Sequence, residues 1–320
     1  MLERRATLLT ATREFFSERG VLEVDTPALA PDTVTDPNIH SLRVEPGGVA
    51  GGDFLQTSPE YAMKRLLAAG CPDIYQLGPA FRGGELGRHH QPEFCLIEWY
   101  RQGFSMPDMA AETCALINAL GDAAGQKPAA TEAIRYQDLF VRELAFDPLS
   151  AGPGEIATAT RRLIAGDLDP TLAVELDRQP ETALDLLLSQ HLVPRLPRDR
   201  LTIISHFPAR QAALARLSPD DPSCAERFEV FFRGLELANG YRECTDAEQL
   251  AARFAQDRER RRAAGLPDRR PDSALLAAVE AGLPECSGVA VGFDRVLMAW
   301  LGVDDISEVR PFAYALPEAT

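Results

Sequence analysis

The chain lacks the features that mark several common protein classes. No apolar run approaches the length of a membrane-spanning helix, and the N-terminus leads into an amphipathic segment instead of a signal peptide. The six cysteines form no CxxC pair, and neither they nor the five histidines show the spacing of a zinc site. We therefore expect reduced thiols, no membrane span and a cytoplasmic location.

Positive charge is also scarce. The chain has 48 acidic residues against 33 lysines and arginines, which gives a formal net charge of -15 and opposes broad binding to a phosphate backbone. With 320 residues, of which 45% are hydrophobic and 25% charged, the composition is that of a globular protein with a substantial core. Nucleic acid is therefore not the first expected partner.

Apolar periodicity and turn residues predict helices and strands in irregular alternation. The predicted helices cover residues 2–18, 246–264 and 272–282, and residues 107–200 are predicted to be mostly helical. Strands are predicted at 21–25, 74–82, 94–100 and 201–204, with a hairpin at 226–243. This order favours an α+β fold, a mainly antiparallel sheet flanked by helices. We expect one catalytic domain over residues 1–320, with a mostly helical insertion at about 107–200.

A glycine-containing stretch, residues 288–295, runs directly into the apolar helix predicted at 296–301. Gly288 and Gly292 allow a backbone to approach a flat ligand, and Arg295 opens a helix whose N-terminal amides favour anions. This is the outline of a nucleotide-phosphate site. Small residues before an amphipathic helix more often serve only packing, so the prediction depends on other stretches that complete the site.

The strand at 94–100 supplies one such stretch. Side chains alternate along a strand, so Phe94, Leu96, Glu98 and Tyr100 share one face. Glu98 lies between two large apolar residues, where a carboxylate needs a charged or hydrogen-bonding partner. Upstream, Phe81-Arg82 begins a glycine- and histidine-containing loop at 83–90, which could clamp a triphosphate or form a solvated turn.

The hairpin predicted at 226–243 supplies the second stretch that completes the site. If Arg233-Gly234 is a two-residue turn, Phe231 faces Glu236 and Glu229 faces Ala238, which makes Glu229 and Glu236 diagonal neighbours on one face. Two such carboxylates can share a magnesium ion with phosphate oxygens. Solvent-facing acidic residues on an ordinary hairpin are the alternative.

Together these motifs resemble class II aminoacyl-tRNA synthetases of the lysyl type. The stretches that resemble motifs 2 and 3 are Phe81-Arg82 with His90 and Phe94, the Glu229 and Glu236 pair, residues 237–240 and residues 292–295. The helix ending at Gly20 and residues 24–27 resemble motif 1, which implies a homodimer. The resemblance covers nearly the whole chain and implies the class II catalytic domain.

Because the sequence starts at the motif 1 helix, we expect no anticodon-binding domain of the kind that a lysyl-tRNA synthetase carries. It therefore resembles the stand-alone elongation factor P lysine ligases. That resemblance implies activation of (R)-β-lysine, or lysine, with ATP and Mg²⁺, and transfer to a lysine side chain of elongation factor P. Nothing resembles an anticodon-reading domain, so tRNA is not the expected acceptor.

The resemblance also implies roles for individual residues. Arg82 and Arg295 would be catalytic, and Glu229 and Glu236 would bind magnesium. The nucleotide would contact Arg82, Gly83, Gly84, Gln91, Phe94, Glu236, Leu237, Gly292 and Arg295. The amino acid would contact Ser58, Pro59, Glu60, Glu98, Tyr100, Asn239, Glu243 and Ala290. Lysyl-tRNA synthetases usually have glycine in place of Ala290, whereas the ligases have alanine.

Two points stay open at this level. Thr57 and Glu60 also fit a capping box, so Glu60 could serve only a helix start. The family pattern Phe-Arg-x-Glu is broken, because Gly84 stands where glutamate is expected and Glu85 follows one position late. The alternatives to a ligase of this type are a compact enzyme that loads lysine onto tRNA, an ammonia-dependent asparagine synthetase, and an inactive regulatory paralogue.

Overall fold

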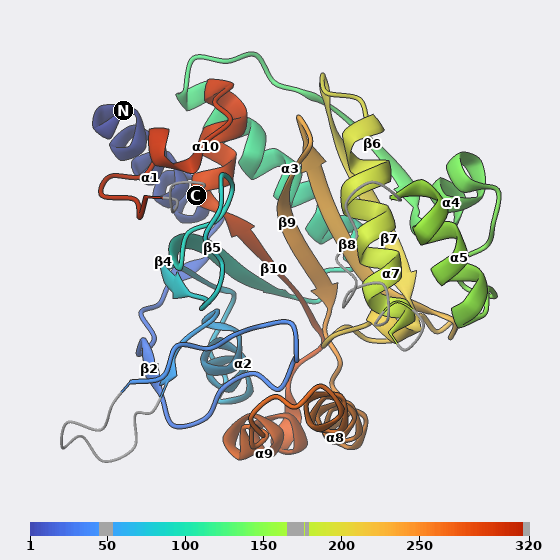
Figure 1. The fold of residues 1–320 in the computed structure, drawn as a ribbon. Coiled ribbons are helices and arrows are strands. Elements are labelled where there is room, and N and C mark those ends of the chain that lie inside the picture. Colours follow the sequence, from blue (N-terminus) through green and yellow to red (C-terminus); the bar gives the residue numbers. More distant parts are fainter. Residues whose placement is uncertain (45–53, 165–175, 177–178, 316–320) are drawn as a thin grey trace. The chain divides into compact units, whose positions relative to one another are not determined.

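The computed structural model describes residues 1–44, 54–164, 176 and 179–315 (Figure 1). The chain divides into two compact units. The first comprises residues 1–128 and 242–320, and the second comprises residues 129–241. Each unit has its own β-strands with helices packed on them.

Four strands form the sheet of the first unit. They lie side by side in the order β1 (Leu22–Glu23), β4 (Ile74–Phe81), β5 (Glu93–Gln102) and β10 (Cys286–Gly292). Strand β1 is parallel to β4, whereas β4 pairs antiparallel with β5, and β5 antiparallel with β10. The central strand β5 is buried from Leu96 to Tyr100, so this stretch lies inside the unit.

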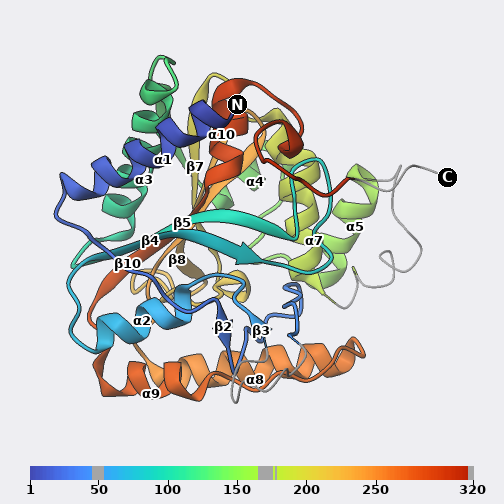
Figure 2. The same cartoon turned by 90° about the vertical axis from the view of Figure 1, so that its left-hand side faces the viewer.

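Helices cover both faces of this sheet. On one face lie α1 (Leu2–Ser17), α3 (Met106–Ala123) and α10 (Phe293–Leu301), and on the other α2 (Glu60–Ala68), α8 (Ala247–Ala263) and α9 (Ser273–Gly282) (Figure 2). A two-stranded sheet of β2 (Leu29–Ala30) and β3 (Phe54–Leu55) and a short 3₁₀ helix at Ile306–Glu308 complete the described elements of this unit.

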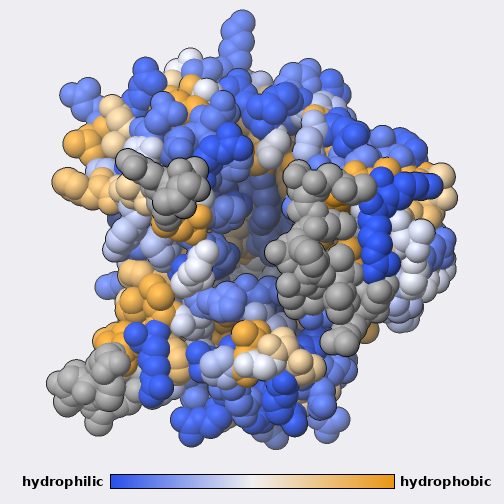
Figure 3. Space-filling view, in the orientation of Figure 1, coloured by the Kyte–Doolittle hydropathy of each residue, from blue (hydrophilic) through white to orange (hydrophobic). Residues whose placement is uncertain are grey.

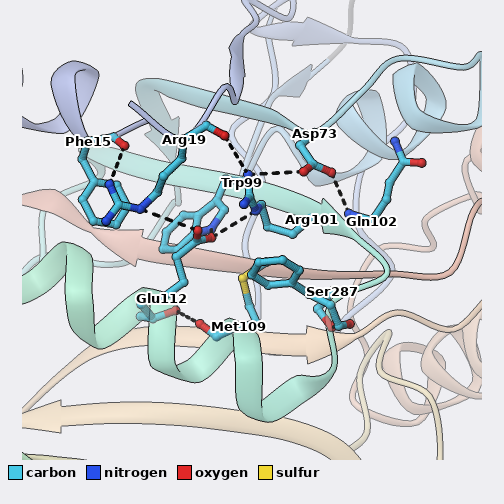
Figure 4. Close-up of polar contacts among 11 residues, drawn as sticks. Phe15, Arg19, Asp73, Trp99, Arg101, Gln102, Met109, Glu112 and Ser287 are labelled. Carbon is cyan, nitrogen blue, oxygen red and sulfur yellow. Dashed lines mark hydrogen bonds and ion pairs between the residues drawn. The ribbon is translucent and has the colours of Figure 1, made fainter. Parts of the chain in front are cut away.

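One face of β5 holds the helices α1 and α3 in place. Glu112 of α3 accepts a hydrogen bond from Trp99 Nε1 at 3.0 Å and pairs with Arg101 Nε at 3.4 Å (Figure 4). Arg19, just after α1, lies 3.9 Å from the other Glu112 oxygen, and Arg101 also pairs with Asp73 at 3.3 Å. Because residues alternate along the strand, the side chains at 98 and 100 are on the opposite face.

The second unit contains four strands in the order β9 (Leu235–Arg242), β8 (Cys224–Phe232), β7 (Arg200–Pro208) and β6 (Ala130–Arg135). Its helices are α4 (Tyr136–Leu144), α5 (Pro153–Leu163) and α7 (Pro180–Leu186). A π-helical turn at Leu187–Leu192 and 3₁₀ turns at Val193–Arg195 and Ala209–Gln211 accompany them. Buried aromatic and aliphatic side chains, including Tyr136, Phe140, Ile156 and Phe207, form its core.

Strand β6 interrupts the stretch that was predicted to be mostly helical. It pairs parallel with β7, and most of its side chains are exposed or half-buried. A strand with this pattern and only one apolar β-branched residue, Ile134, gives a weak sequence signal, because its conformation depends on pairing with β7.

The predicted hairpin is present, but its register differs from the prediction. Arg233 and Gly234 form the two-residue turn with φ angles of 53° and 84°, as a type I′ turn requires, and Phe231 faces Glu236 as expected. Glu229, however, faces Asn239 and not Ala238, because the register shifts between Val230 and Phe231. One extra residue on β9 makes this β-bulge.

The structure confirms the predicted fold class. Antiparallel pairings predominate within both units, and among the described pairs only β1 with β4 and β6 with β7 are parallel. In the described parts of the chain, no helix is both long and apolar enough to cross a membrane. The face shown in Figure 3 is largely hydrophilic, with small hydrophobic areas scattered over it.

Candidate functional site

The first unit brings together acidic residues from separate parts of the sequence. Glu60 begins α2, Glu98 and Tyr100 lie on β5, and Glu243 directly follows β9. With Lys64 of α2 these residues form what we call the acidic cluster. Except for Glu60, whose side chain is 20% exposed, every member is buried. A group of buried carboxylates is costly unless cations or hydrogen bonds compensate it.

Among the described residues, the side-chain hydrogen bonds to Glu98 come from neutral hydroxyl groups, and the Lys64 charge acts on it without direct contact. Ser58 Oγ donates to Glu98 Oε2 at 2.6 Å, and the Tyr100 hydroxyl donates to Oε1 at 2.8 Å, which confirms that residues 98 and 100 share a face. No ion pair to Glu98 is found among the described residues. Burial, together with the nearby Glu60 carboxylate, raises the pKa of Glu98 to about 8. The site thus holds a carboxyl group that a ligand ammonium would stabilise in its ionised form.

Glu60 does not form the capping box that its spacing with Thr57 suggested. Pro59 occupies the N-cap of α2 without a side-chain hydrogen bond, and the Glu60 amide donates to Ser58 Oγ at 3.0 Å. The Glu60 carboxylate instead accepts from Lys64 Nζ at 2.6 Å. Its side chain therefore belongs to the acidic cluster.

Lys64 bridges two carboxylates that lie far apart in the sequence. Its Nζ is 2.6 Å from Glu60 Oε1 and also 2.6 Å from Glu243 Oε2. Burial alone would lower the pKa of Lys64, but the charges of Glu243 and Glu60 outweigh it and raise that pKa, so the ammonium form is retained. Burial raises the pKa of Glu243, and Lys64 opposes this shift.

Strand β10 contributes backbone to the cluster. The Gly288 amide donates to the Glu243 carboxylate, and a Cβ atom at residue 288 would lie 2.3 Å from Tyr100 Cε1 and 2.6 Å from Glu243 Oε1. Glycine is therefore required for these side chains to cross the strand. Ala290 pairs in register with Glu98 and is half-buried, so its methyl group lies on the strand next to that carboxylate.

Arg82 and Phe94 lie at the other end of β4 and β5. The Arg82 guanidinium is 5.1 Å from the centre of the Phe94 ring, and its buried Nε has no hydrogen-bond partner among the described residues. Gly84, with φ of 76°, turns the chain after Gly83, and Glu85 then lies 3.8 Å from Arg82 Nη1. Glu85 thus reaches the arginine despite the glycine at position 84.

Arg295 lies in the first turn of α10, after Gly292. Its Nη2 donates to His90 Nε2 at 2.5 Å. The preceding residue, Asp294, is buried, accepts from the Cys95 amide at 2.8 Å, and pairs with Arg5 and, at 3.5 Å, with Arg310. These contacts fix the start of the helix that carries Arg295.

Gln91 is engaged by the C-terminal segment. Its Oε1 accepts from the Tyr314 amide at 2.7 Å and its Nε2 donates to the Tyr314 carbonyl at 3.2 Å. Its predicted contact with the nucleotide stays a prediction.

The remaining predicted site residues belong to the second unit. Glu229 is buried and accepts from Arg227 Nη2 at 2.5 Å, while Arg227 Nε donates to Asn239 Oδ1 at 3.2 Å. Burial raises the pKa of Glu229 to about 8, and the charge of Glu236 contributes to the rise, so these two carboxylates interact. Glu236 is exposed, and Leu237 is buried beside the bulge.

The sequence-based site omitted three residues that make these contacts. Lys64 is four positions after Glu60, the spacing of an ion pair on one helix face, and Arg227 is two positions before Glu229 on the same strand face. Gly288 was noted for its flexibility but not as a site residue. Local spacing could have suggested the first two, whereas the close packing over Gly288 depends on residues 100 and 243.

Comparisons with known proteins identify the family of the chain. A family model described as tRNA synthetases class II (D, K and N) matches residues 1–315. Proteins named elongation factor P (R)-β-lysine ligase are similar over nearly the full length. That of Klebsiella pneumoniae subsp. pneumoniae is 46% identical over 315 residues, 97% of this chain and 94% of the relative. The Erwinia tasmaniensis protein is 45% identical over 315 residues, with the same coverage. The Photorhabdus laumondii protein is 44% identical over 316 residues, 98% of this chain and 94% of the relative.

A family match over nearly the whole chain, together with relatives above 40% identity, settles the family. The chain belongs to the class II tRNA synthetases of the D, K and N group.

Proposed function

We propose that the protein is an ATP-dependent ligase that activates (R)-β-lysine, or lysine, and transfers it to a lysine side chain of elongation factor P. The observation that carries the proposal is the acidic cluster, in which Glu98 is buried without a cationic partner among the described residues. A substrate ammonium would supply that partner. The relatives are named for this reaction.

Two chemical steps follow. A carboxylate oxygen of the amino acid bonds to the α-phosphorus of ATP, and the bond to the bridging oxygen breaks, which releases pyrophosphate. The acceptor amine then attacks the carbonyl carbon of the adenylate, loses a proton and displaces AMP. No covalent enzyme intermediate is needed, so catalysis consists of positioning and electrostatic stabilisation.

The residues present fit ATP. Arg82 has an unpaired buried Nε for a phosphate or carboxylate oxygen, and Phe94 offers an aromatic ring beside it. Arg295, near the N-terminal end of α10, would bind a terminal phosphate. Glu229 and Glu236 are oxygen donors of the kind magnesium prefers, and they would hold the ion, which supplies charge neutralisation on the phosphates.

The alternative functions are less well supported. An asparagine synthetase needs a site for an acidic substrate, which the buried carboxylates oppose. An inactive paralogue would be expected to lose the phosphate-binding arginines or the metal carboxylates, and Arg82, Arg295, Glu229 and Glu236 are all present. We propose that the enzyme acts in the cytoplasm, in keeping with six cysteines that form no disulfide.

The acceptor is tested directly. Purified enzyme, ATP and labelled lysine or (R)-β-lysine are incubated with either elongation factor P or total tRNA. We expect stable label on the protein, because the net charge of -15 gives little long-range attraction to tRNA. Label on tRNA alone, for both isomers, would contradict the proposed function.

Arg295→Ala and Glu236→Gln should each lower adenylate formation by about 100-fold or more, because each removes charge stabilisation that the phosphates need in the transition state. ATP–pyrophosphate exchange measures the effect. Arg262→Ala and Glu248→Gln, at exposed positions of α8, are the matched controls. Near-normal exchange in folded Arg295 and Glu236 variants would show that the nucleotide site is elsewhere.

Ala290→Gly should raise activity with α-lysine relative to β-lysine by about tenfold, the usual effect of a methylene-sized difference. The methyl group lies opposite Glu98, where it would restrict the position of the substrate amine. The ratio of the two kcat/KM values is the measurement, and Ala133→Gly on strand β6 is the control for a strand glycine. If Ala290 only packs the strand, both activities fall in parallel and the ratio is unchanged.

We further propose a homodimer formed through α1 and the strand that follows it. Leu2 and Leu22 are 63% and 49% exposed, so this region offers apolar side chains to a second copy. Light scattering at micromolar concentration should give about twice the chain mass of 35.0 kDa. A mass near that of one chain would refute the dimer.

A further inference from the structure

Lys64 bridges two carboxylates of the acidic cluster and has no assigned part in the reaction. The chain contains only two lysines, Lys64 and Lys127, among 33 basic residues. Lys127 is exposed, whereas the Lys64 side chain is 1% exposed. The chain thus uses arginine for nearly all its cations and a compact ammonium at this one buried place.

A simple helix-stabilising role does not account for its contacts. An ion pair between Glu60 and Lys64 on the same helix would need one carboxylate and would be worth little at the surface. Lys64 also contacts Glu243, whose side chain is 1% exposed, at the same 2.6 Å distance. Burying a second carboxylate costs free energy that a helix pair does not require.

We propose that Lys64 is a positioning residue that holds Glu60 and Glu243 in their ionised forms and sets the charge of the acidic cluster to match a substrate with two ammonium groups. Once a bound substrate ammonium stabilises the ionised form of Glu98, the three carboxylates and the Lys64 ammonium together leave two net negative charges. This inference rests on the proposed function, because it assigns the two charges to the two amino groups of lysine or β-lysine.

Titratable groups beside Lys64 and the three carboxylates lie on α2, β5 and β10 and directly after β9, while Asp257 of α8, Asp272 at the start of α9, and Arg242 and Glu285 act on the outer members of this group. The adjacent groups are Glu60 and Tyr61 on α2, Glu98 and Tyr100 on β5, Glu243 after β9, and Cys286 on β10. Burial raises the pKa of each tyrosine and of the cysteine, and the neighbouring carboxylates add to the rise. These three groups stay neutral near pH 7, and among the described residues Lys64 is the cation that pairs directly with Glu60 and Glu243.

The effect of removing the Lys64 ammonium depends on pH. Removing the ammonium raises the pKa of Glu243 further, because burial then acts without the opposing charge of Lys64. Below that raised pKa the Glu243 carboxyl group is neutral and cannot pair with a substrate ammonium. The loss in Lys64→Met is therefore largest at low pH and shrinks as the pH rises.

The first test compares Lys64→Met with the matched control Lys127→Met by ATP–pyrophosphate exchange between pH 6 and 9. Lys64→Met should lose about tenfold or more in kcat/KM for the amino acid at pH 7, the equivalent of one pKa unit. The rise of kcat/KM on the acidic side of its pH profile should move to higher pH. The KM for ATP should stay unchanged. A folded Lys64→Met enzyme with an unaltered amino-acid KM and pH profile would overturn the proposal.

The second test does not depend on the folding of that variant. Lysine labelled with ¹³C at Cε gives two NMR signals, and Lys127→Arg leaves only that of Lys64. The Lys64 signal should remain that of an ammonium up to pH 10 and shift when unlabelled lysine or β-lysine is added, but not with norleucine, which lacks the second ammonium. A Lys64 signal whose chemical shift does not change when lysine or β-lysine is added would contradict the proposal.

Exchange by the wild-type enzyme distinguishes a failure of the proposed function from a failure of the role proposed for Lys64. Absence of exchange with both lysine isomers would contradict the proposed function. Exchange in the wild type together with unchanged behaviour of Lys64→Met would contradict only the role of Lys64.

Discussion

The cost of burying charge is the constraint on which the site of the first unit depends. Three carboxylates lie within one cluster, and such groups would take up protons or unfold the site without compensation. The Lys64 ammonium compensates Glu60 and Glu243, and two hydroxyl groups hold Glu98. Glu98 therefore keeps a raised pKa, and under the proposed function the substrate ammonium would stabilise its ionised form.

Strand β5 has the acidic cluster on one face and the contacts to the supporting helices on the other. Trp99 and Arg101 point to one face, where Glu112 connects them to the surrounding helices, whereas Glu98 and Tyr100 point to the other. A strand held rigidly on one face can position charged groups on the opposite face with little freedom. Glycine at position 288 of the neighbouring strand allows the acidic side chains to cross it.

Arg295, which we propose binds phosphate, directly follows a residue that several contacts hold in place. Asp294 is buried and joins the N-terminal helix through Arg5, strand β5 through the Cys95 amide, and the C-terminal segment through Arg310. Three segments distant in sequence thus converge on the residue before Arg295. A cation that is already held in place needs little movement during the reaction. Effective electrostatic stabilisation of a transition state requires this condition.

The sequence alone determined the fold class, most of the helices and strands, the two-residue hairpin turn, and the shared face of Glu98 and Tyr100. These follow from local periodicity and turn chemistry, which the chain carries within a few residues. Only the tertiary structure decided that Lys64 joins Glu60 to Glu243, that Gly288 admits no side chain, that β6 is a strand, and that a bulge places Glu229 opposite Asn239. Each of these depends on a partner distant in the sequence or on a single inserted residue, and local patterns do not encode which buried groups will meet.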